Sequence, residues 1–211
     1  MHNSNPYAQG GWQVSQSNNN SDPPQDHYLP PSVQGALPSL PSSSSPTHGQ
    51  PNFVTFYFTS FNPDITNCVV IGPARKYTDI LTATNPESTI ECTLFQDSDG
   101  RISSMIEWIG RHPYVEVKDA VSREPVRDFI RLSADQSYRT MIVKGKQYAW
   151  VPSPTGMILY NMTYNPPEIV ARAIRSHDTV TLQITAQAIH AGLMDVTVVA
   201  AVLLLSNRNI D

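Results

Sequence analysis

The chain has 211 residues, of which 40% are hydrophobic and 15% are charged, and its formal net charge at pH 7 is -4. All 14 Lys and Arg residues lie at Arg75 or later, and 15 of the 18 Asp and Glu residues lie there too, because only Asp22, Asp26 and Asp64 come before. Binding of DNA or RNA needs a cationic excess on one face, so this near-neutral balance argues against a nucleic-acid partner.

The first 50 residues differ in composition from the rest of the chain. They are dominated by Asn, Ser, Gln, Pro and Gly, and they include the runs Asn18–Asn20 and Ser42–Ser45. Such a segment buries too little apolar surface to offset the entropy lost on ordering. We therefore expect 1–50 to be a disordered leader and 51–211 to form one domain with its own core. The leader also lacks the charged start and apolar stretch of a secretion signal, so we expect an intracellular protein.

From Asn52 onward the sequence changes to short runs of β-branched and aromatic residues that are separated by turn-forming residues. This pattern predicts about twelve antiparallel strands. The runs are Phe53–Ser60, Cys68–Ile71, Tyr77–Ala83, Thr89–Phe95, Arg101–Ile109, Tyr114–Lys118, Tyr138–Val143, Gln147–Val151, Met157–Asn161, Ile169–Ile174 and Thr179–Ala186. Cys68 and Cys92 each lie within such a run, so we expect two buried thiols and no disulfide.

Strict alternation of apolar and polar residues is clearest in the last of these runs, where Val180, Leu182 and Ile184 share one face. One face of the sheet should therefore be buried and the other solvated. A sheet of about twelve strands hides its two edges most economically by closing on itself, so we predict a mainly β fold built on a closed antiparallel barrel.

An apolar run from Gly192 to Leu205 follows, with Asp195 as its one charged residue. As a helix it would be roughly 21 Å long, against about 30 Å of bilayer hydrocarbon, so it is short for a membrane span. A helix that is apolar all round has to be enclosed, and we predict a core helix near 190–205 inside the barrel, with Asp195 near its first turn. The Val and Thr content leaves a strand open, and insertion as a membrane anchor is the other alternative.

The segment between Ser122 and Ser133 interrupts the strands and predicts a short helix. Pro125 suits the first helical position, and Val126, Phe129 and Ile130 recur at spacings of three and four residues.

This helix would place Arg127 and Arg131 on one side, with Arg123 just before it. Glu124 and Asp128 each precede an Arg by three residues. Such spacing favours a solvated face with weak ion pairs, and the alternative is a contact with an anion or a lipid headgroup.

The motifs that are typical of catalytic or metal sites are absent. The sequence has no Gly-rich phosphate loop, no His-Glu-x-x-His, no Cys-x-x-Cys and no Gly-x-Ser-x-Gly. His112, His177 and His190 lack the spacing of metal ligands. Asp97-Ser98-Asp99-Gly100 is similar to the start of a calcium loop, but Trp108 stands where a carboxylate is required, so we expect a hairpin turn. We therefore expect no enzyme activity, no catalytic residue, no metal and no cofactor.

Three stretches together resemble a known family: Ile106-Glu107-Trp108, the segment from Lys144 to Trp150, and Gly192-Leu193-Met194-Asp195 followed by Val and Leu. Over roughly Phe53 to Arg208 the chain looks like a fungal domain family of unknown function. That family in turn resembles the tubby carboxy-terminal fold, which LURP-one-related proteins and phospholipid scramblases share. The resemblance implies a twelve-stranded barrel threaded by a hydrophobic carboxy-terminal helix.

Relatives of the tubby fold include phosphoinositide binders and membrane-associated proteins. The resemblance therefore implies a non-enzymatic module in the cytoplasm or at the membrane periphery that binds phospholipid or phosphoinositide on an anionic membrane surface. The candidate headgroup ligands are Arg123, Arg127 and Arg131, with Lys144 and Lys146 at a hairpin tip as a second set. The alternative is a structural or protein-interaction domain without a lipid ligand, whose partner surface would be an exposed sheet face or the leader.

Overall fold

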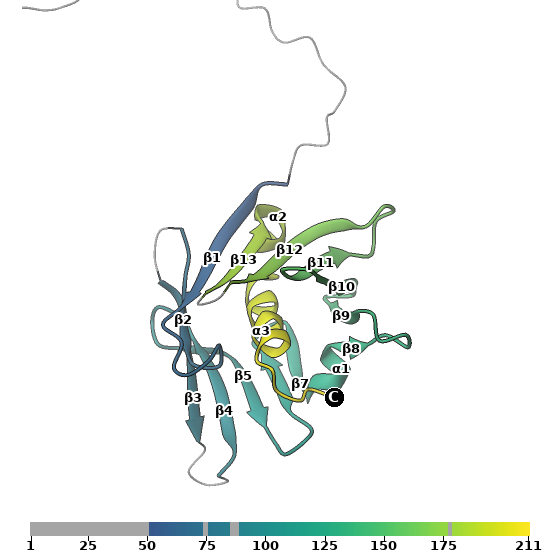
Figure 1. The fold of residues 1–211 in the computed structure, drawn as a ribbon. Helices are drawn as coiled ribbons and strands as arrows, with labels where there is room; N and C mark the ends of the chain where they lie inside the picture. The colour runs from purple at the N-terminus through teal and green to yellow at the C-terminus, as the bar shows by residue number, and fades with distance from the viewer. Residues whose placement is uncertain (1–50, 74–75, 85–88, 177–178) are drawn as a thin grey trace, which may run out of the picture. The chain divides into compact units, whose positions relative to one another are not determined.

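The computed structural model describes residues 51–73, 76–84, 89–176 and 179–211 (Figure 1). The predicted leader 1–50 and the candidate residue His177 lie outside the described residues. The strands are β1 (Phe53–Thr59), β2 (Cys68–Ile71), β3 (Lys76–Thr84), β4 (Glu91–Gln96), β5 (Ile102–Trp108), β6 (Tyr114–Val117), β7 (Val121–Pro125), β8 (Arg131–Leu132), β9 (Arg139–Val143), β10 (Lys146–Ser153), β11 (Gly156–Asn161), β12 (Glu168–Arg175) and β13 (Val180–Thr185). The helices are α1 (Val126–Phe129), α2 (Ala186–His190) and α3 (Met194–Leu205).

The thirteen strands form one antiparallel sheet in the order β7-β6-β5-β4-β3-β2-β1-β13-β12-β11-β10-β9-β8. Strands that are consecutive in the chain pair with each other except β7 and β8, and the pairing of β1 with β13 joins the two halves. The mainly β, antiparallel fold is therefore confirmed, and each predicted run corresponds to a strand within a few residues. Alternation along β13 places Val180, Leu182 and Ile184 in the core, as predicted.

The prediction of a closed barrel is wrong in one respect, because hydrogen bonds do not close the sheet. Its two end strands, β7 and β8, are consecutive in the chain, and only the four-residue helix α1 separates them. The short helix expected between Ser122 and Ser133 is present as α1, and the flanking residues of that segment belong to the strands β7 and β8. Pro125 has no N–H for the sheet, and the chain turns inward after it so that Val126, Phe129 and Ile130 become buried. The contacts of α1 with β6, β7, β8 and β9 bridge the ends of the sheet.

The terminal apolar run folds as helix α3, as predicted, and α3 lies at the centre of the curved sheet (Figure 1). Its buried residues are Met194, Val196, Thr197, Val198, Val199, Ala200, Ala201, Val202 and Leu203. They contact β5, β6 and β13, so sheet strands from both halves enclose the helix. No helix among the described residues is long and apolar enough to cross a membrane.

Both cysteines are buried free thiols, which confirms the expectation of no disulfide. Cys68 lies on β2 and donates to the carbonyl of Ile65 at 3.3 Å. Burial, together with the nearby Asp64 carboxylate, raises the pKa of Cys68 to about 12. A thiol with this pKa stays protonated at neutral pH, so Cys68 acts as a packing residue.

The first turn of α3 is tied to the sheet by one polar contact. Asp195 lies in that turn, as predicted, and its Oδ1 accepts a hydrogen bond of 2.7 Å from the hydroxyl of Tyr77 on β3. Burial and the neighbouring Asp195 carboxylate raise the pKa of the Tyr77 phenol. The bond therefore holds the helix start against β3 while Tyr77 is protonated.

We expect the Tyr77→Phe variant to lose about 2 kcal/mol of unfolding free energy, since the lost bond has a charged acceptor. The pKa of Tyr77 is raised above its unfolded value, so its contribution is complete below pH ~10 and is lost as pH rises further. Urea unfolding at neutral pH and above pH ~10 measures both effects. Tyr57→Phe, at an exposed position on β1, is the control, and an equal loss in both variants would refute the role of the Tyr77 bond.

Candidate functional site

Arg123, the first of the predicted headgroup ligands, lies on β7 and is engaged within the protein. Its Nε and Nη2 contact Oε2 of Glu107 at 2.8 and 2.6 Å, and its guanidinium lies 4.3 Å from the ring centroid of Tyr114. Both partners lie on the neighbouring strands β5 and β6. An external anion would have to compete with this carboxylate and this ring, so Arg123 is poorly suited to hold a headgroup.

Arg127 and Arg131 are both exposed, but they lie on different elements, α1 and β8. The expected ion pairs with Glu124 and Asp128 do not form among the described residues, because the segment is not one continuous helix. Instead Glu124, Asp128 and Arg131 line a hollow of about 330 Å³, together with Phe129, Thr140, Met141, Ile142 and Gln147. Burial and the Asp128 carboxylate raise the pKa of Glu124, while Arg131 acts in the opposite direction.

Two apolar residues close to Arg131 in the chain have exposed side chains. Leu132 follows it on β8 and is 40% exposed, and Tyr138, at the end of the β8–β9 connection, is 38% exposed. The N–H of Ser133 donates to the carbonyl of Tyr138 at 2.9 Å, which holds the two ends of this connection together. We call Arg127, Arg131, Leu132 and Tyr138 the α1–β9 surface. It includes two cations, an aliphatic side chain and an aromatic side chain, and the side chains of Arg131 and Leu132 point to opposite faces of β8.

Lys144 and Lys146 lie at the tip of the β9–β10 hairpin, as predicted. Lys144 and Gly145 form a two-residue turn with φ values of 49° and 74°. The Nζ of Lys144 lies 3.4 Å from the carbonyl oxygen of Ala191, in the connection between α2 and α3, whereas Lys146 is exposed. The five predicted cations therefore do not converge on one point. Arg127 and Arg131 lie on either side of the α1–β8 junction.

A separate hollow of about 680 Å³ lies at the carboxyl end of α3, and no sequence motif indicates it. It is lined by Phe61, Pro63, Asp64, Ile65, Arg175, Ser176, Thr179, Val180, Leu205, Ser206 and Asn207. Nη1 of Arg175 lies 3.4 Å from the carbonyl oxygen of Leu205, which places a cation at the negative end of the helix dipole. These residues come from three distant segments, so no local motif could have revealed the hollow.

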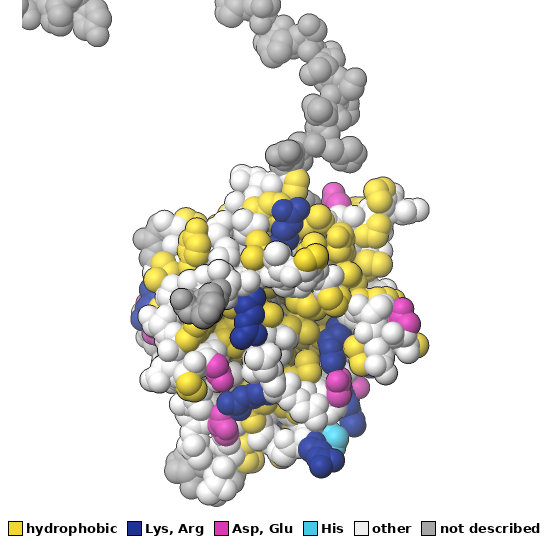
Figure 2. All heavy atoms as spheres, in the orientation of Figure 1, with side chains coloured by type: hydrophobic (Ala, Val, Ile, Leu, Met, Phe, Trp, Pro, Cys, Tyr) yellow, Lys and Arg dark blue, Asp and Glu magenta, His cyan; other side chains and the backbone are white. Residues whose placement is uncertain are grey.

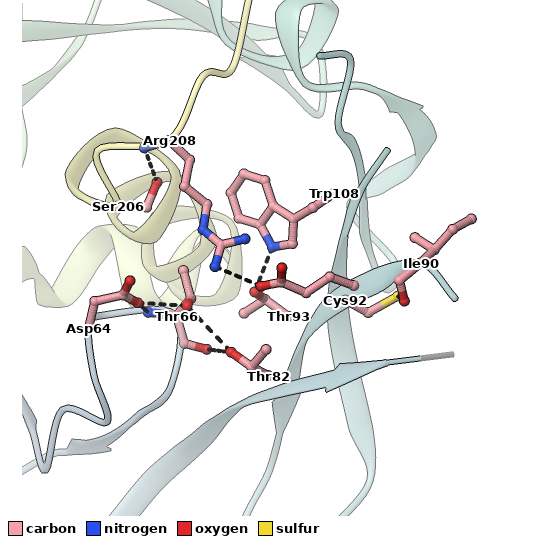
Figure 3. A network of polar contacts seen from close by, with 10 residues as sticks. Asp64, Thr66, Thr82, Ile90, Cys92, Thr93, Trp108, Ser206 and Arg208 are labelled. Atoms are coloured by element: carbon pink, nitrogen blue, oxygen red, sulfur yellow. Dashed lines mark hydrogen bonds and ion pairs between the residues drawn. The ribbon is translucent and has the colours of Figure 1, made fainter. Parts of the chain in front are cut away.

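The polar network beside this hollow fixes the segment that follows α3 (Figure 3). Arg208 pairs with Glu91 at 2.6 Å and lies 4.5 Å from the Trp108 ring centroid, while Trp108 Nε1 donates to Thr93 at 2.9 Å. Farther along, Arg139 makes two bonds of 2.8 Å to the Asp211 carboxylate, which lower the pKa of that carboxyl. These contacts of Arg208 and Arg139 stabilise the folded chain.

On the face that Figure 2 shows, Lys and Arg side chains are spread around hydrophobic atoms over α3, with Asp and Glu among them.

The Asp97–Gly100 segment, which is similar to the start of a calcium loop, has a structural role. Asp97 Oδ1 accepts from the N–H groups of Asp99 and Arg101 at 2.8 and 2.9 Å, so the Asp97–Gly100 segment is the hairpin turn that was predicted. These backbone bonds lower the pKa of Asp97. Within the described part of the chain, no group of three or more His, Cys, Asp or Glu side chains is arranged to hold a metal ion.

Comparison with known proteins does not assign the chain to a family. No protein-family model matches the sequence, and no curated protein is similar to it. An X-ray structure of a protein from Arabidopsis thaliana aligns with a probability of 1.00 and a TM-score of 0.41, at 12% sequence identity. The alignment covers 71% of this chain and 90% of that chain. A similarity of this degree does not establish a common fold.

Proposed function

We propose that the protein is a non-enzymatic, tubby-like intracellular module that binds the headgroups of anionic phospholipids at the membrane periphery. The α1–β9 surface is the observation that supports this function. Arg127 and Arg131 are exposed there without an ion-pair partner among the described residues, and Leu132 and Tyr138, close to them in the chain, are also exposed. Cations next to aliphatic and aromatic side chains suit the boundary between headgroups and acyl chains.

The charges of the surrounding residues set the expected strength of this contact. Asp128 is exposed on α1, and Asp135, in the β8–β9 connection, has a pKa lowered to about 2 by hydrogen bonds from Ser133 and Ser137. Both acidic side chains oppose the two arginines. We therefore expect weak, salt-sensitive binding, in which each arginine contributes about 1 kcal/mol.

Vesicle co-sedimentation of the full chain tests the assignment of Arg127 and Arg131. We expect Arg127→Gln combined with Arg131→Gln to weaken binding to phosphatidylserine or phosphoinositide vesicles roughly 30-fold, which is the effect of about 2 kcal/mol. The matched control is Arg123→Gln, because the Arg123 guanidinium already contacts Glu107 and Tyr114. Equal loss in the double variant and in the control would contradict the assignment, as would unchanged binding of the double variant.

A further inference from the structure

The opening of the sheet leaves part of one strand edge without a partner. β8 pairs with β9 only through Arg131–Thr140 and Leu132–Arg139, whereas β9 continues to Val143. At the other end of the sheet, β7 pairs with β6 on one side. We call the gap between β7 and residues 141–143 of β9 the seam. No strand among the described residues occupies it, and α1, which contacts both β7 and β9, borders it.

The geometry of the hairpin determines which backbone groups face the seam. A two-residue turn closes on a pair of residues that exchange both backbone hydrogen bonds, here Val143 and Lys146. The direction of the backbone N–H and C=O groups alternates along a strand. Those of Val143 and Met141 therefore point to β10, while those of Thr140 and Ile142 point away from it. Thr140 has Arg131 opposite it, but Ile142 has no opposite residue in the described pairings. The N–H and C=O of Ile142 are therefore free to pair with another strand.

The side chains around the seam favour a specific kind of occupant. Ile142 is 68% exposed and lines the hollow of about 330 Å³ that also contains Glu124, Asp128 and Phe129. An unpaired edge beside an exposed apolar side chain is a template for strand addition. Glu124 and Asp128 line this hollow with one cation, Arg131, so the lining has a negative formal charge and favours an added cation.

The register of the sheet indicates where such a cation would lie. Glu124 is opposite Val115, which is buried, so the Glu124 side chain is on the inner face of the sheet, whereas exposed Ile142 is on the outer face. Successive residues of an added strand point to opposite faces. A strand in the seam would therefore present an apolar residue beside Ile142 and a Lys or Arg, next in its sequence, to the two carboxylates.

We propose that the seam binds an extended peptide of a partner protein, in which apolar residues alternate with Lys or Arg, as an additional strand on β9. The leader of this chain does not fit that description, because its 50 residues contain no Lys or Arg. The seam and the proposed lipid contact share Arg131, which lines the same hollow as Glu124 and Asp128.

Fluorescence anisotropy with the full chain tests this proposal. The probe is fluorescein-labelled Val-Lys-Val-Lys-Val-Lys-Val, and the control peptide carries Glu in place of each Lys. We expect saturable binding of the Lys peptide and much weaker binding of the Glu peptide. Absence of binding, or equal binding of both peptides, would overturn the proposal.

Two variants locate the binding. Ile142→Pro removes the N–H that faces the seam, at an edge position that tolerates proline, and we expect a roughly tenfold weaker affinity. Ile142→Ala keeps that N–H and is the matched control, with thermal unfolding as the check on folding. Glu124→Gln combined with Asp128→Asn should abolish the preference for Lys over Glu even if the proline variant fails to fold. Retention of that preference would overturn the proposal.

Discussion

The Val199→Asp variant is expected to lose the cooperative folding of the domain. Val199 lies in the middle of α3 and is fully buried, and the residues on both sides of it are also buried. A carboxylate at this position would be surrounded by apolar side chains, so it would have to be buried unpaired or become protonated. The cost exceeds about 4 kcal/mol, which is a large part of the 5–15 kcal/mol that typically stabilises a domain.

Far-UV circular dichroism during urea unfolding measures this effect. Leu204→Asp provides the control on the same helix, because Leu204 is only partly buried and lies in the last turn. We expect a reduced but cooperative transition for the control and no cooperative transition for Val199→Asp. A wild-type transition in Val199→Asp would show that α3 is not the core of the folded domain.

Replacement of Trp150 by Ala is the second change with a large expected effect. Trp150 on β10 is 0% exposed and is among the largest fully buried side chains. Its loss should cost about 3–5 kcal/mol through the cavity that remains.

The hydrogen bonding of the indole nitrogen predicts a difference between two variants of Trp150. Nε1 of Trp150 has no hydrogen-bond partner among the described residues, whereas Nε1 of Trp108 donates to Thr93. Trp150→Phe should therefore retain much more of the unfolding free energy than Trp150→Ala, because no hydrogen bond is lost. Urea unfolding followed by circular dichroism compares the variants, and equal losses for Trp150→Phe and Trp150→Ala would contradict the assigned packing role.

The strands could be predicted because their burial alternates along the sequence, and α3 because its apolar run was too uniform and too long for a half-solvated strand. The ends of the sheet were missed for a physical reason. Val126, Phe129 and Ile130 have helical spacing, and the same spacing arises when a four-residue helix turns buried residues inward between two strands. A local pattern cannot separate these two outcomes, because contacts with β6 and β9 decide between them.

The candidate site was predictable only in part. The sequence placed Lys144 and Lys146 on a hairpin tip, which the structure confirms. It could not show that the Arg123 guanidinium donates to Glu107, 16 residues earlier in the chain. The seam was also hidden, because it depends on β8 being two residues long while β9 has five.

The central functional claim is peripheral binding to anionic lipid, and co-sedimentation of the wild-type full chain with vesicles tests it most directly. The vesicles are phosphatidylcholine alone, or phosphatidylcholine with phosphatidylserine or with phosphoinositide, each at low and at moderate salt. We expect binding to the anionic vesicles that weakens as salt increases, and little binding to phosphatidylcholine alone. Absence of binding to every vesicle at low salt would contradict the lipid function and leave the protein-interaction function as the better account.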